Sequence, residues 1–416
     1  GPDSGSRLCL DGLGIRRVSA VPSGIEALSL SDNRLRELGP VSACGSLREL
    51  NLAGNQLDET AAAPLAELPQ LLVLDLSRNL LRGLGPLFPA GAAARGEAWP
   101  RLESLDLSAN AALAELAPAL AARRLCSLVA GGLALTSLRC QRSESLEVLD
   151  LRGCCLQEVT GLTLLPALRS LLLDGNALLA GCEDAAAGHP RLETLGLARN
   201  ATARLDPPRL PMLTALDASE NRLTEVPDFS GVPRLNSLSL PENGLTSLGS
   251  ALSSLCCLTF LDVSRNCITR LEPSMSSALR KVQVLLLAGN DFQQLEDVLG
   301  VFGSLDRPCL QHLDLRENPL CLAFYPCPQL LPFWTWEANR FPAEIDLEGS
   351  VQLDTSTSSA REMYRSNAVS VCPALRSLDG TLLERAAALQ PADAAGPSAA
   401  STWPDPEEVL YTTPGQ

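Results

Sequence analysis

The 416-residue chain is acidic, with a formal net charge of −15, and 46% of its residues are hydrophobic while only 4% are aromatic. This charge disfavours direct binding to nucleic acid or to an anionic membrane surface, because both kinds of binding need clustered Lys and Arg. No apolar run reaches the roughly 18 residues that a membrane span requires, and no secretory signal is visible.

The first seven residues open with Gly1-Pro2-Asp3-Ser4, which is typical of a remnant left by tag removal. We therefore assign residues 1–7 to a remnant and an N-terminal lead. From residue 8 to residue 320 the chain repeats the unit Leu-x-Leu-x-x-Asn-x-Leu, mostly at a spacing of 21 to 24 residues. Clear copies begin at Leu28, Leu50, Leu74, Leu105, Leu149, Leu171, Leu195, Leu216, Leu238, Leu261, Leu285 and Leu313.

Degenerate copies at Leu8 and Leu128 bring the total to about 14 repeats, with insertions around residues 90–99 and 301–309. A period in the low twenties is that of leucine-rich repeats. The alternation in Leu-x-Leu predicts a short strand with its leucines inward, and the few remaining residues allow only short helical or 3₁₀ turns. The sequence thus predicts an α/β leucine-rich-repeat solenoid, with a curved parallel sheet on the concave face and these turns on the convex face.

The array over residues 8–320 resembles the intracellular repeats of about 22 residues typified by the SDS22-like regulators of protein phosphatase 1. The resemblance extends to a C-terminal cap, whose parts here are Asn318-Pro319-Leu320-Cys321, Tyr364-Arg365 and the segment Cys372 to Gly380. The resemblance implies that residues 321–385 form this cap, which is split by an aromatic-rich insertion of roughly 40 residues. We expect the polar stretch 349–361 to be mobile and the Ala/Pro-rich residues 386–416 to form a flexible tail.

A second resemblance is to secreted leucine-rich-repeat arrays, which end in a cysteine-rich cap that begins Asn-Pro-Leu-x-Cys. Cys321 and Cys327, followed by Phe333-Trp334-x-Trp336, are similar to that opening. The Cys-x-Cys doublet of such caps is missing, and most other cysteines lie on repeat positions, as small buried hydrophobes do. These features favour the cytoplasm or nucleus, and an extracellular location is the alternative.

Residues that could support catalysis or hold a cofactor are scarce. The two histidines are His189, in a loop where we expect it to be solvated, and His312, on a repeat strand and more typical of a contact residue. No zinc-ligand spacing, phosphate-binding loop or nucleophile motif is present. We therefore predict a protein that is not an enzyme and that uses no cofactor or metal.

Alternation places three kinds of candidate contact residues on the concave face or at the cap. A carboxylate column would attract a basic partner, although short polar residues are also common at this position of the repeat. Apolar residues on the same face suggest a contact, or else cover by another part of this chain. The clustered tryptophans of the insertion either anchor an interface or form a small hydrophobic core that seals the last repeat. The candidates are Asp75, Asp106, Asp150, Asp217, Asp262, Asp314, Val148, Leu172, Phe260, Val284, Leu286, His312, Trp334 and Trp336.

These residues predict a non-enzymatic scaffold or adaptor that binds a protein partner on its concave acidic face. The partner would carry a basic or mixed basic and apolar surface, and neither direct nucleic-acid binding nor membrane insertion is expected. A regulatory subunit of an enzyme complex, such as a phosphatase, is one form of this function. The alternative is an extracellular leucine-rich-repeat receptor or adhesion ectodomain.

Overall fold

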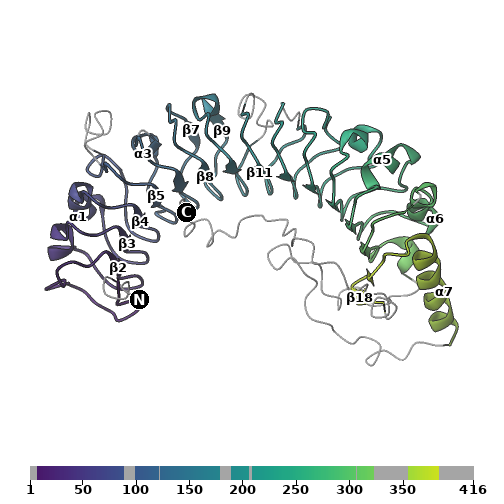
Figure 1. The fold of residues 1–416 in the computed structure, drawn as a ribbon, viewed down its shortest axis with the longest axis horizontal. Helices are drawn as coiled ribbons and strands as arrows, with labels where there is room; N and C mark the ends of the chain where they lie inside the picture. Colours follow the sequence, from purple (N-terminus) through teal and green to yellow (C-terminus); the bar gives the residue numbers. More distant parts are fainter. Residues whose placement is uncertain are drawn as a thin grey trace. The chain divides into compact units, whose positions relative to one another are not determined.

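The computed structural model describes residues 7–88, 99–120, 122–178, 189–205, 209–305, 307–322 and 355–383. The chain divides into two compact units, Gly1–Ala201 (unit 1) and Thr202–Gln416 (unit 2), and each is described by itself. The division falls inside the predicted array of residues 8–320. In both units the main strands line one side, and the short helices lie on the other (Figure 1).

Unit 1 is built on a row of three-residue parallel strands that pair leucine to leucine, as in Leu50 with Leu74. The degenerate copies at Leu8 and Leu128 lie in β1 and β6, so their strand assignment is confirmed. The strands, in spatial order, are β1 (Arg7–Cys9), β2 (Ala27–Ser29), β3 (Glu49–Asn51), β4 (Val73–Asp75), β5 (Ser104–Asp106), β6 (Ser127–Val129), β8 (Val148–Asp150), β10 (Ser170–Leu172) and β11 (Thr194–Gly196).

The outer side of unit 1 has the predicted short turns together with a feature that was not predicted. A second parallel pair, β7 (Ser137–Arg139) and β9 (Glu158–Thr160), forms there between consecutive repeats. Its short segments lack the Leu-x-Leu pattern that identifies the main strands. The helical turns are η1 (Gly39–Ala43), α1 (Glu59–Ala62), η2 (Ala63–Glu67), α3 (Ala117–Leu120) and η3 (Leu162–Leu164).

Unit 2 continues the same design and ends in a strand that reverses direction. Its strands are β12 (Ala215–Asp217), β13 (Ser237–Ser239), β14 (Phe260–Asp262), β15 (Val284–Leu286), β16 (His312–Asp314), β17 (Ser377–Leu378) and β18 (Thr381–Leu382). They are parallel up to β17, with which β18 pairs antiparallel. The outer elements are η4 (Ala251–Ser254), η5 (Pro273–Met275), α5 (Ser276–Leu279), α6 (Glu296–Leu299), η6 (Phe302–Ser304), η7 (Pro319–Cys321) and α7 (Thr355–Val371).

The core of each unit consists of stacked aliphatic layers. In a single repeat, Leu50, Leu52 and Leu57 point inward and are at most 1% exposed, and Leu65 of the outer turn closes the same layer. Full burial of such a side chain contributes roughly 1.5–3 kcal/mol. Leucine repeated in register therefore supplies a continuous core with few aromatic rings, which explains the composition.

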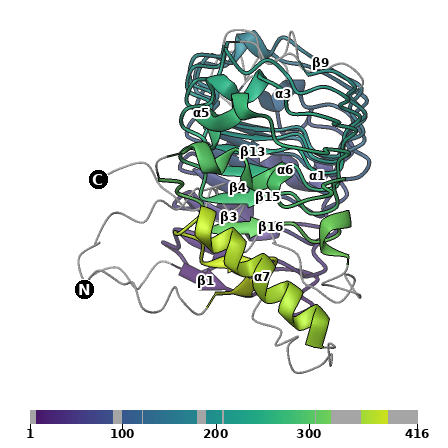
Figure 2. The ribbon, with the colours of Figure 1, turned by 90° about the vertical axis from the view of Figure 1, so that its right-hand side faces the viewer.

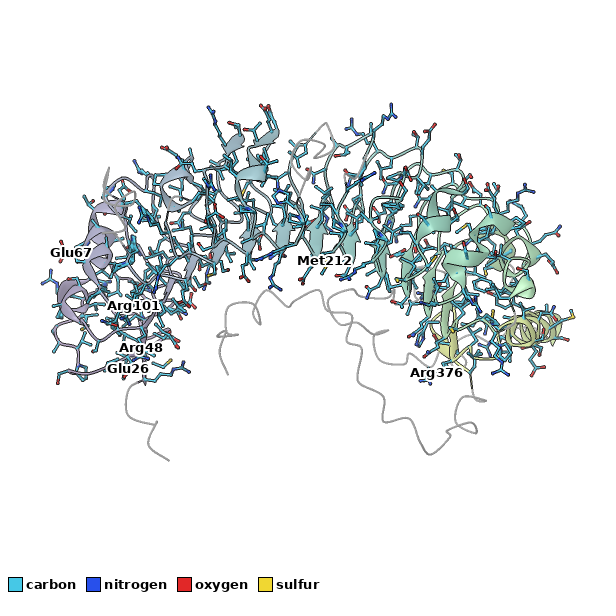
Figure 3. The ribbon with its side chains drawn as sticks, turned by 45° about the horizontal axis from the view of Figure 1, so that its top comes forward. Glu26, Arg48, Glu67, Arg101, Met212 and Arg376 are labelled. Carbon is cyan, nitrogen blue, oxygen red and sulfur yellow. The ribbon has the colours of Figure 1, made fainter. Side chains whose placement is uncertain are left out.

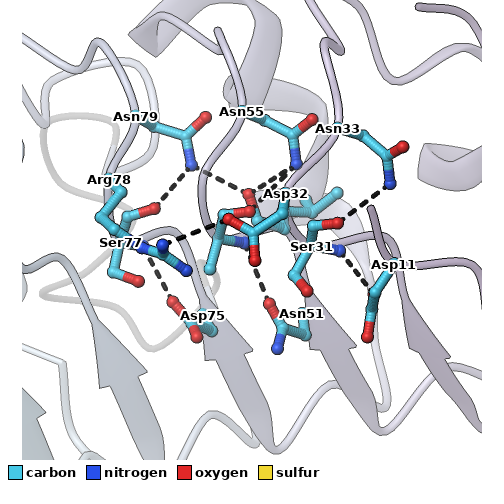
Figure 4. Close-up of polar contacts among 12 residues, drawn as sticks. Asp11, Ser31, Asp32, Asn33, Asn51, Asn55, Asp75, Ser77, Arg78 and Asn79 are labelled. Atoms are coloured by element: carbon cyan, nitrogen blue, oxygen red, sulfur yellow. Dashed lines mark hydrogen bonds and ion pairs between the residues drawn. The ribbon is translucent and has the colours of Figure 1, made fainter. Parts of the chain in front are cut away.

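A ladder of asparagines links each repeat to its neighbours (Figure 4). The Asn55 amide donates to the carbonyls of Leu30 in the preceding repeat and Leu52 in its own repeat, both at 3.0 Å. Its Oδ1 accepts from the backbone N–H of Leu35 at 3.0 Å. Where Cys154 stands at the asparagine position, its thiol donates to the Ala130 carbonyl at 3.0 Å, so this repeat keeps one bond of the ladder.

The residue before the ladder position adopts left-handed backbone geometry in most repeats. Asp32, Arg78 and Arg265 have φ values of 53°, and Gly54 has 65°. This geometry favours glycine because a Cβ is strained there. At Gly54 a Cβ would also meet the Asp32 carboxylate, so glycine at that repeat avoids both the backbone strain and this contact.

The C-terminal helix α7 lies at the last strands of unit 2 (Figures 1 and 2). Tyr364 of α7 is 5% exposed, and its hydroxyl donates to Asp379 Oδ2 at 2.8 Å. The other oxygen of Asp379 accepts from the Leu315 N–H at 2.7 Å and so joins the helix to the last repeat. Because α7 begins at Thr355, the prediction of mobility is wrong for residues 355–361. None of the described helices is both long and apolar enough to cross a membrane.

Candidate functional site

The predicted carboxylate column lies on the sheet face, and each member also closes the turn after its strand. Asp75 Oδ1 accepts from the Ser77 N–H at 2.8 Å (Figure 4). The same bond to the N–H two residues further on, at 2.8 to 3.1 Å, is made by Asp106, Asp150, Asp217, Asp262 and Asp314. A side chain that bonds its own backbone in this way stabilises a turn. The column therefore has a structural role whether or not it binds a partner.

Two carboxylates of unit 1 stand next to each other without a basic residue between them. Asp75 and Asp106 are partners in the register of β4 and β5. Burial, the charge of Asp75 and, more weakly, that of Asp150 raise the pKa of Asp106 to about 6. A raised pKa means that the ionised form is disfavoured at this position. A cation placed here would relieve that unfavourable charge.

Two members of the column are neutralised inside the protein. Asp150 is 4% exposed, and its Oδ2 lies 2.6 Å from Nη2 of Arg152, whose side chain is 40% exposed. Asp314 and Arg316 form the same pair at 2.5 Å, with side chains only 3% and 1% exposed. A partner thus reaches Asp150 only past Arg152. Asp314 does not reach the surface, so it is left out of the contact proposed below.

A row of serines and valines accompanies the carboxylates on the face of unit 1. Ser104 and Ser127 face each other in the register of β5 and β6. They are 9% and 8% exposed, and their hydroxyls have no hydrogen-bond partner within the described residues. The sequence analysis missed both serines, although their place directly before a repeat leucine would have identified them. The unit 1 face is defined here as Val73, Asp75, Ser104, Asp106, Ser127, Val129 and Val148.

The predicted apolar contacts differ between the two units. In unit 1, Val148 and Leu172 are half-buried and remain accessible on the face. In unit 2, Phe260 is 5% exposed and Leu286 is 4% exposed, whereas Val284 is half-buried. The expectation of exposed apolar area is therefore wrong for Phe260 and Leu286. Adjacent strands lie only about 4.8 Å apart, so large neighbouring side chains on one face cover each other's flanks.

The remaining polar residues of the unit 2 sheet are held close to the cap. His312 Nδ1 lies 2.8 Å from Ser377 Oγ, and burial together with the charge of Arg376 (Figure 3) lowers the pKa of His312. Burial and the charges of Asp217 and Asp314 raise the pKa of Asp262 to about 6. Burial also raises the pKa of Asp217. In the folded protein the charged forms of these three groups are therefore less favourable than in water.

The exposure of several cysteines and of His189 differs from what the sequence predicts. Cys154 is fully buried, as predicted, but Cys155, Cys267 and Cys309 are exposed. Cys155 and Cys267 directly follow the ladder position, where alternation turns the side chain away from the core, and the outer pair Cys256 and Cys257 is also exposed. The described cysteines are all free thiols. His189 is 1% exposed, so the expected solvated role is wrong.

Several predictions concern residues outside the described part of the chain. These are the tryptophans Trp334 and Trp336, the cysteine Cys327 and the tail 386–416. Cys321 is described and buried, and its thiol lies 3.7 Å from the Tyr364 hydroxyl. Among the described residues, no group of three or more His, Cys, Asp or Glu side chains could hold a metal ion.

Comparison with known proteins agrees with this repeat architecture. Two families described as leucine rich repeats match residues 233–292 and 43–66, and the chain is a leucine-rich-repeat protein. It is 29% identical to human Podocan-like protein 1 over 302 residues, which cover 70% of this chain and 52% of that protein. It is 30% identical to Transforming growth factor beta activator LRRC32 of Pongo abelii over 341 residues, covering 74% and 48%. The chain thus spans about half the length of these curated relatives.

Solved structures are similar in fold alone. An internalin of Listeria monocytogenes has a TM-score of 0.51 at 20% identity, covering 75% of this chain and 81% of its own. The TLR13–ssRNA13 complex has a TM-score of 0.53 at 22% identity, covering 75% and 46%. The predicted fold class is therefore confirmed. Neither these structures nor the two relatives above is named as a phosphatase regulator, so the finer resemblance to the SDS22-like group is not confirmed.

Proposed function

We propose that this chain is a non-enzymatic binding protein of the extracellular leucine-rich-repeat type, and that its unit 1 face holds a protein segment rich in Arg or Lys. The extracellular assignment is supported by the relatives, one of which is named as a growth factor activator. Another, Leucine-rich repeat-containing G-protein coupled receptor 5 of Rattus norvegicus, is 30% identical over 166 residues, covering 39% of this chain and 17% of that protein. A phosphatase-regulating role has no such support.

The observation that carries the choice of face is the pair of adjacent, half-buried carboxylates Asp75 and Asp106. Ser104 and Ser127 are nine-tenths buried without a described partner, and buried hydroxyls normally have one. Asp75 and Asp106 lie in the next row of the same sheet. A peptide can donate to the carboxylates through guanidinium or ammonium groups, whereas the two serine hydroxyls are covered by their neighbours and are not reached by a ligand on the face. The arrangement therefore fits a basic peptide better than an acidic or purely apolar one.

The valines of the unit 1 face supply the apolar part of this contact. Val129 lies between Asp106 and Asp150 in the strand register, and Val148 lies beside Ser127. Both are half-buried, so a ligand side chain that packs on them removes apolar surface from water. Because the strands form one hydrogen-bonded row, the surface is preformed and the ordering cost falls mainly on the ligand.

The test uses asparagine substitutions, because an amide oxygen can still accept the turn bond while the charge is lost. We expect the double variant Asp75→Asn/Asp106→Asn to bind a fluorescent Arg-Leu repeat decapeptide at least tenfold more weakly than the parent protein, and with a smaller salt dependence. Fluorescence anisotropy at 50 and 150 mM NaCl measures both quantities.

The matched control for that experiment is Asp228→Asn. Asp228 makes the same kind of turn bond, to the Ser230 N–H at 2.9 Å, but lies outside the strands. The affinity of the Asp228→Asn variant for the decapeptide should equal that of the parent protein. Unchanged binding in the double variant, or an equal loss in the control, would exclude the unit 1 face as the contact.

A second candidate function, an intracellular scaffold with the same face, is favoured by one observation. Exposed free thiols such as Cys9, Cys155 and Cys267 are typical of a reducing compartment. Counting thiols in protein secreted by cultured cells, denatured without reductant, separates the two candidates. Secretion with bridged cysteines supports the extracellular reading, whereas retention in the cytosol with 14 titratable thiols supports the scaffold.

A further inference from the structure

Unit 1 contains a hollow of about 400 Å³ that is lined by Arg16, Arg34, Arg36 and Gln56. Consecutive repeats bring these residues together. The Arg34 N–H donates to the Ile15 carbonyl at 2.8 Å, and the Gln56 N–H donates to the Leu35 carbonyl at 2.9 Å. The four lining residues lie outside the strands, after the left-handed turns, so the hollow is separate from the unit 1 face.

Among the residues that the structure describes, the three guanidinium groups of the hollow have no acidic partner. Arg36 Nε donates to Gln56 Oε1 at 2.9 Å. In the described part of the chain, no carboxylate forms an ion pair with Arg16, Arg34 or Arg36. Other arginines of the same unit do have such partners.

The contrast with the rest of unit 1 is clear at neighbouring positions. Arg48 Nε lies 3.4 Å from Glu26 Oε2 (Figure 3), and Arg78 Nη1 lies 3.1 Å from Asp32 Oδ1. In a protein of net charge −15, carboxylates are plentiful, yet none of those that the structure describes is paired with the arginines of the hollow. Three like charges repel each other unless an anion joins them.

We propose that this hollow binds a phosphate or sulfate group carried by a small molecule. Guanidinium groups match such oxyanions well, because each presents paired N–H donors in a planar fork. Three forks from different backbone positions can share the oxygens of a tetrahedral group, whereas a carboxylate offers only two oxygens. Gln56 adds an amide that can bond a neutral part of the ligand.

The size of the hollow sets the class of ligand. Pockets for small molecules typically measure about 300–1,000 Å³, and this hollow lies in the lower part of that range. It is larger than a bare tetrahedral ion needs, so it has room for the sugar-sized group to which the phosphate or sulfate is attached. The ligand is therefore a sugar ester or a molecule of similar size.

The experiment is isothermal titration of the whole chain at 50 mM NaCl with glucose 6-phosphate, glucose 6-sulfate, inorganic phosphate and glucose. We expect saturable binding of at least one ester, weaker binding of inorganic phosphate and none of glucose. The variant Arg34→Gln/Arg36→Gln should weaken ester binding at least tenfold. Both side chains are exposed, and a thermal melt verifies that the variant is folded.

The matched control is Arg142→Gln/Arg270→Gln, which removes the same charge from exposed positions elsewhere. Arg142 is paired with Glu144 at 2.8 Å and does not line the hollow. Full ester affinity in this control supports the proposal, and preference for one ester identifies the oxyanion. Equal loss in both double variants, or no saturable binding by the parent protein, overturns it.

Discussion

At the scale of single residues, the same short sequence produces two different environments. Leu-Asp-Leu-Arg occurs at Asp150 and again at Asp314, and in both places the arginine bonds the aspartate two residues before it. Arg152 is partly exposed, whereas Arg316 is covered by the cap, where a Cβ on Gly380 would lie 3.4 Å from its Nη1. The sequence predicts the carboxylate position, but the neighbouring elements decide whether the pair reaches solvent.

The difference between these pairs can be measured with matched substitutions. Arg316→Gln leaves a buried carboxylate without its counter-charge and should lower the free energy of unfolding by about 3–5 kcal/mol. Arg152→Gln changes a partly exposed pair and should cost about 1 kcal/mol or less. Urea unfolding followed by circular dichroism measures both, and similar losses in the two variants would contradict this account.

The asparagine ladder leads to a second prediction at this scale. Asn110 is fully buried, and its amide donates to the carbonyls of Leu76 at 3.0 Å and Leu107 at 2.8 Å. Asn110→Ala leaves these groups without that donor, at roughly 1–3 kcal/mol for each orphaned group. The urea midpoint should fall markedly. The control Leu80→Ala, at a position 57% exposed, should shift it little, and equal shifts would show that the ladder is not the cause.

At the scale of elements, prediction succeeded where one pattern fixes one structure. Leu-x-Leu specified the strands, including those at the degenerate copies. The pair β7 and β9 could not be predicted, because its backbone pairing depends on how two outer segments stack. Thr355–Arg361 is polar and reads as mobile in isolation, but it continues into a helix that docks through Tyr364. Tertiary contact overrides local composition in both cases.

The docking of α7 can be tested through one hydroxyl. Tyr364→Phe removes the donor to Asp379 but keeps the ring that packs against the last repeat. We expect faster hydrogen exchange of the α7 amides, by about tenfold or more, because a net loss of about 1–1.5 kcal/mol weakens docking. Amides of unit 1 should be unaffected. Met363→Ala, at a position 64% exposed, is the control, and unchanged α7 protection in Tyr364→Phe would contradict the docking role.

At the scale of the whole molecule, the chain separates its charges between surfaces of different kinds. The carboxylate column follows the strands, and the arginines of the hollow in unit 1 lie after the left-handed turns. Alternation predicted the column correctly as a set of positions on the sheet. It could not predict that Asp314 is sealed by the cap or that Phe260 and Leu286 are covered, because both depend on the size of neighbouring side chains. The partner-binding role of these positions stays a prediction.

The acidic face should also make stability depend on pH. The pKa of Asp106 is about 6, above the ordinary aspartate value of 3.8, so the folded state takes up this proton more readily than the unfolded state. Ionised Asp106 therefore costs stability above pH 6, and the cost disappears as the pH falls toward 4. We expect Asp106→Asn to raise the Tm by roughly 2–4 °C at pH 7.5 and by much less at pH 5.

The comparison with Asp228→Asn isolates this effect. A backbone bond from Ser230 lowers the pKa of Asp228, so this substitution should not raise the Tm at either pH. Scanning calorimetry at pH 7.5 and 5 provides the data, and a Tm gain for Asp106→Asn that is independent of pH would show that charge is not its origin. Since the double variant that contains this substitution is expected to bind the peptide more weakly, the carboxylates of the unit 1 face lower stability while they support binding.

The reversal of β18 limits how the length of this protein can change. A parallel row grows by adding another copy of the same repeat, but β18 runs antiparallel to β17 and presents an edge only two residues long. Such a short edge is a poor template for another strand. Gene duplication or protein engineering can therefore lengthen the array by inserting whole repeats before β16, where neighbouring strands pair in parallel, and not by fusing them after the cap.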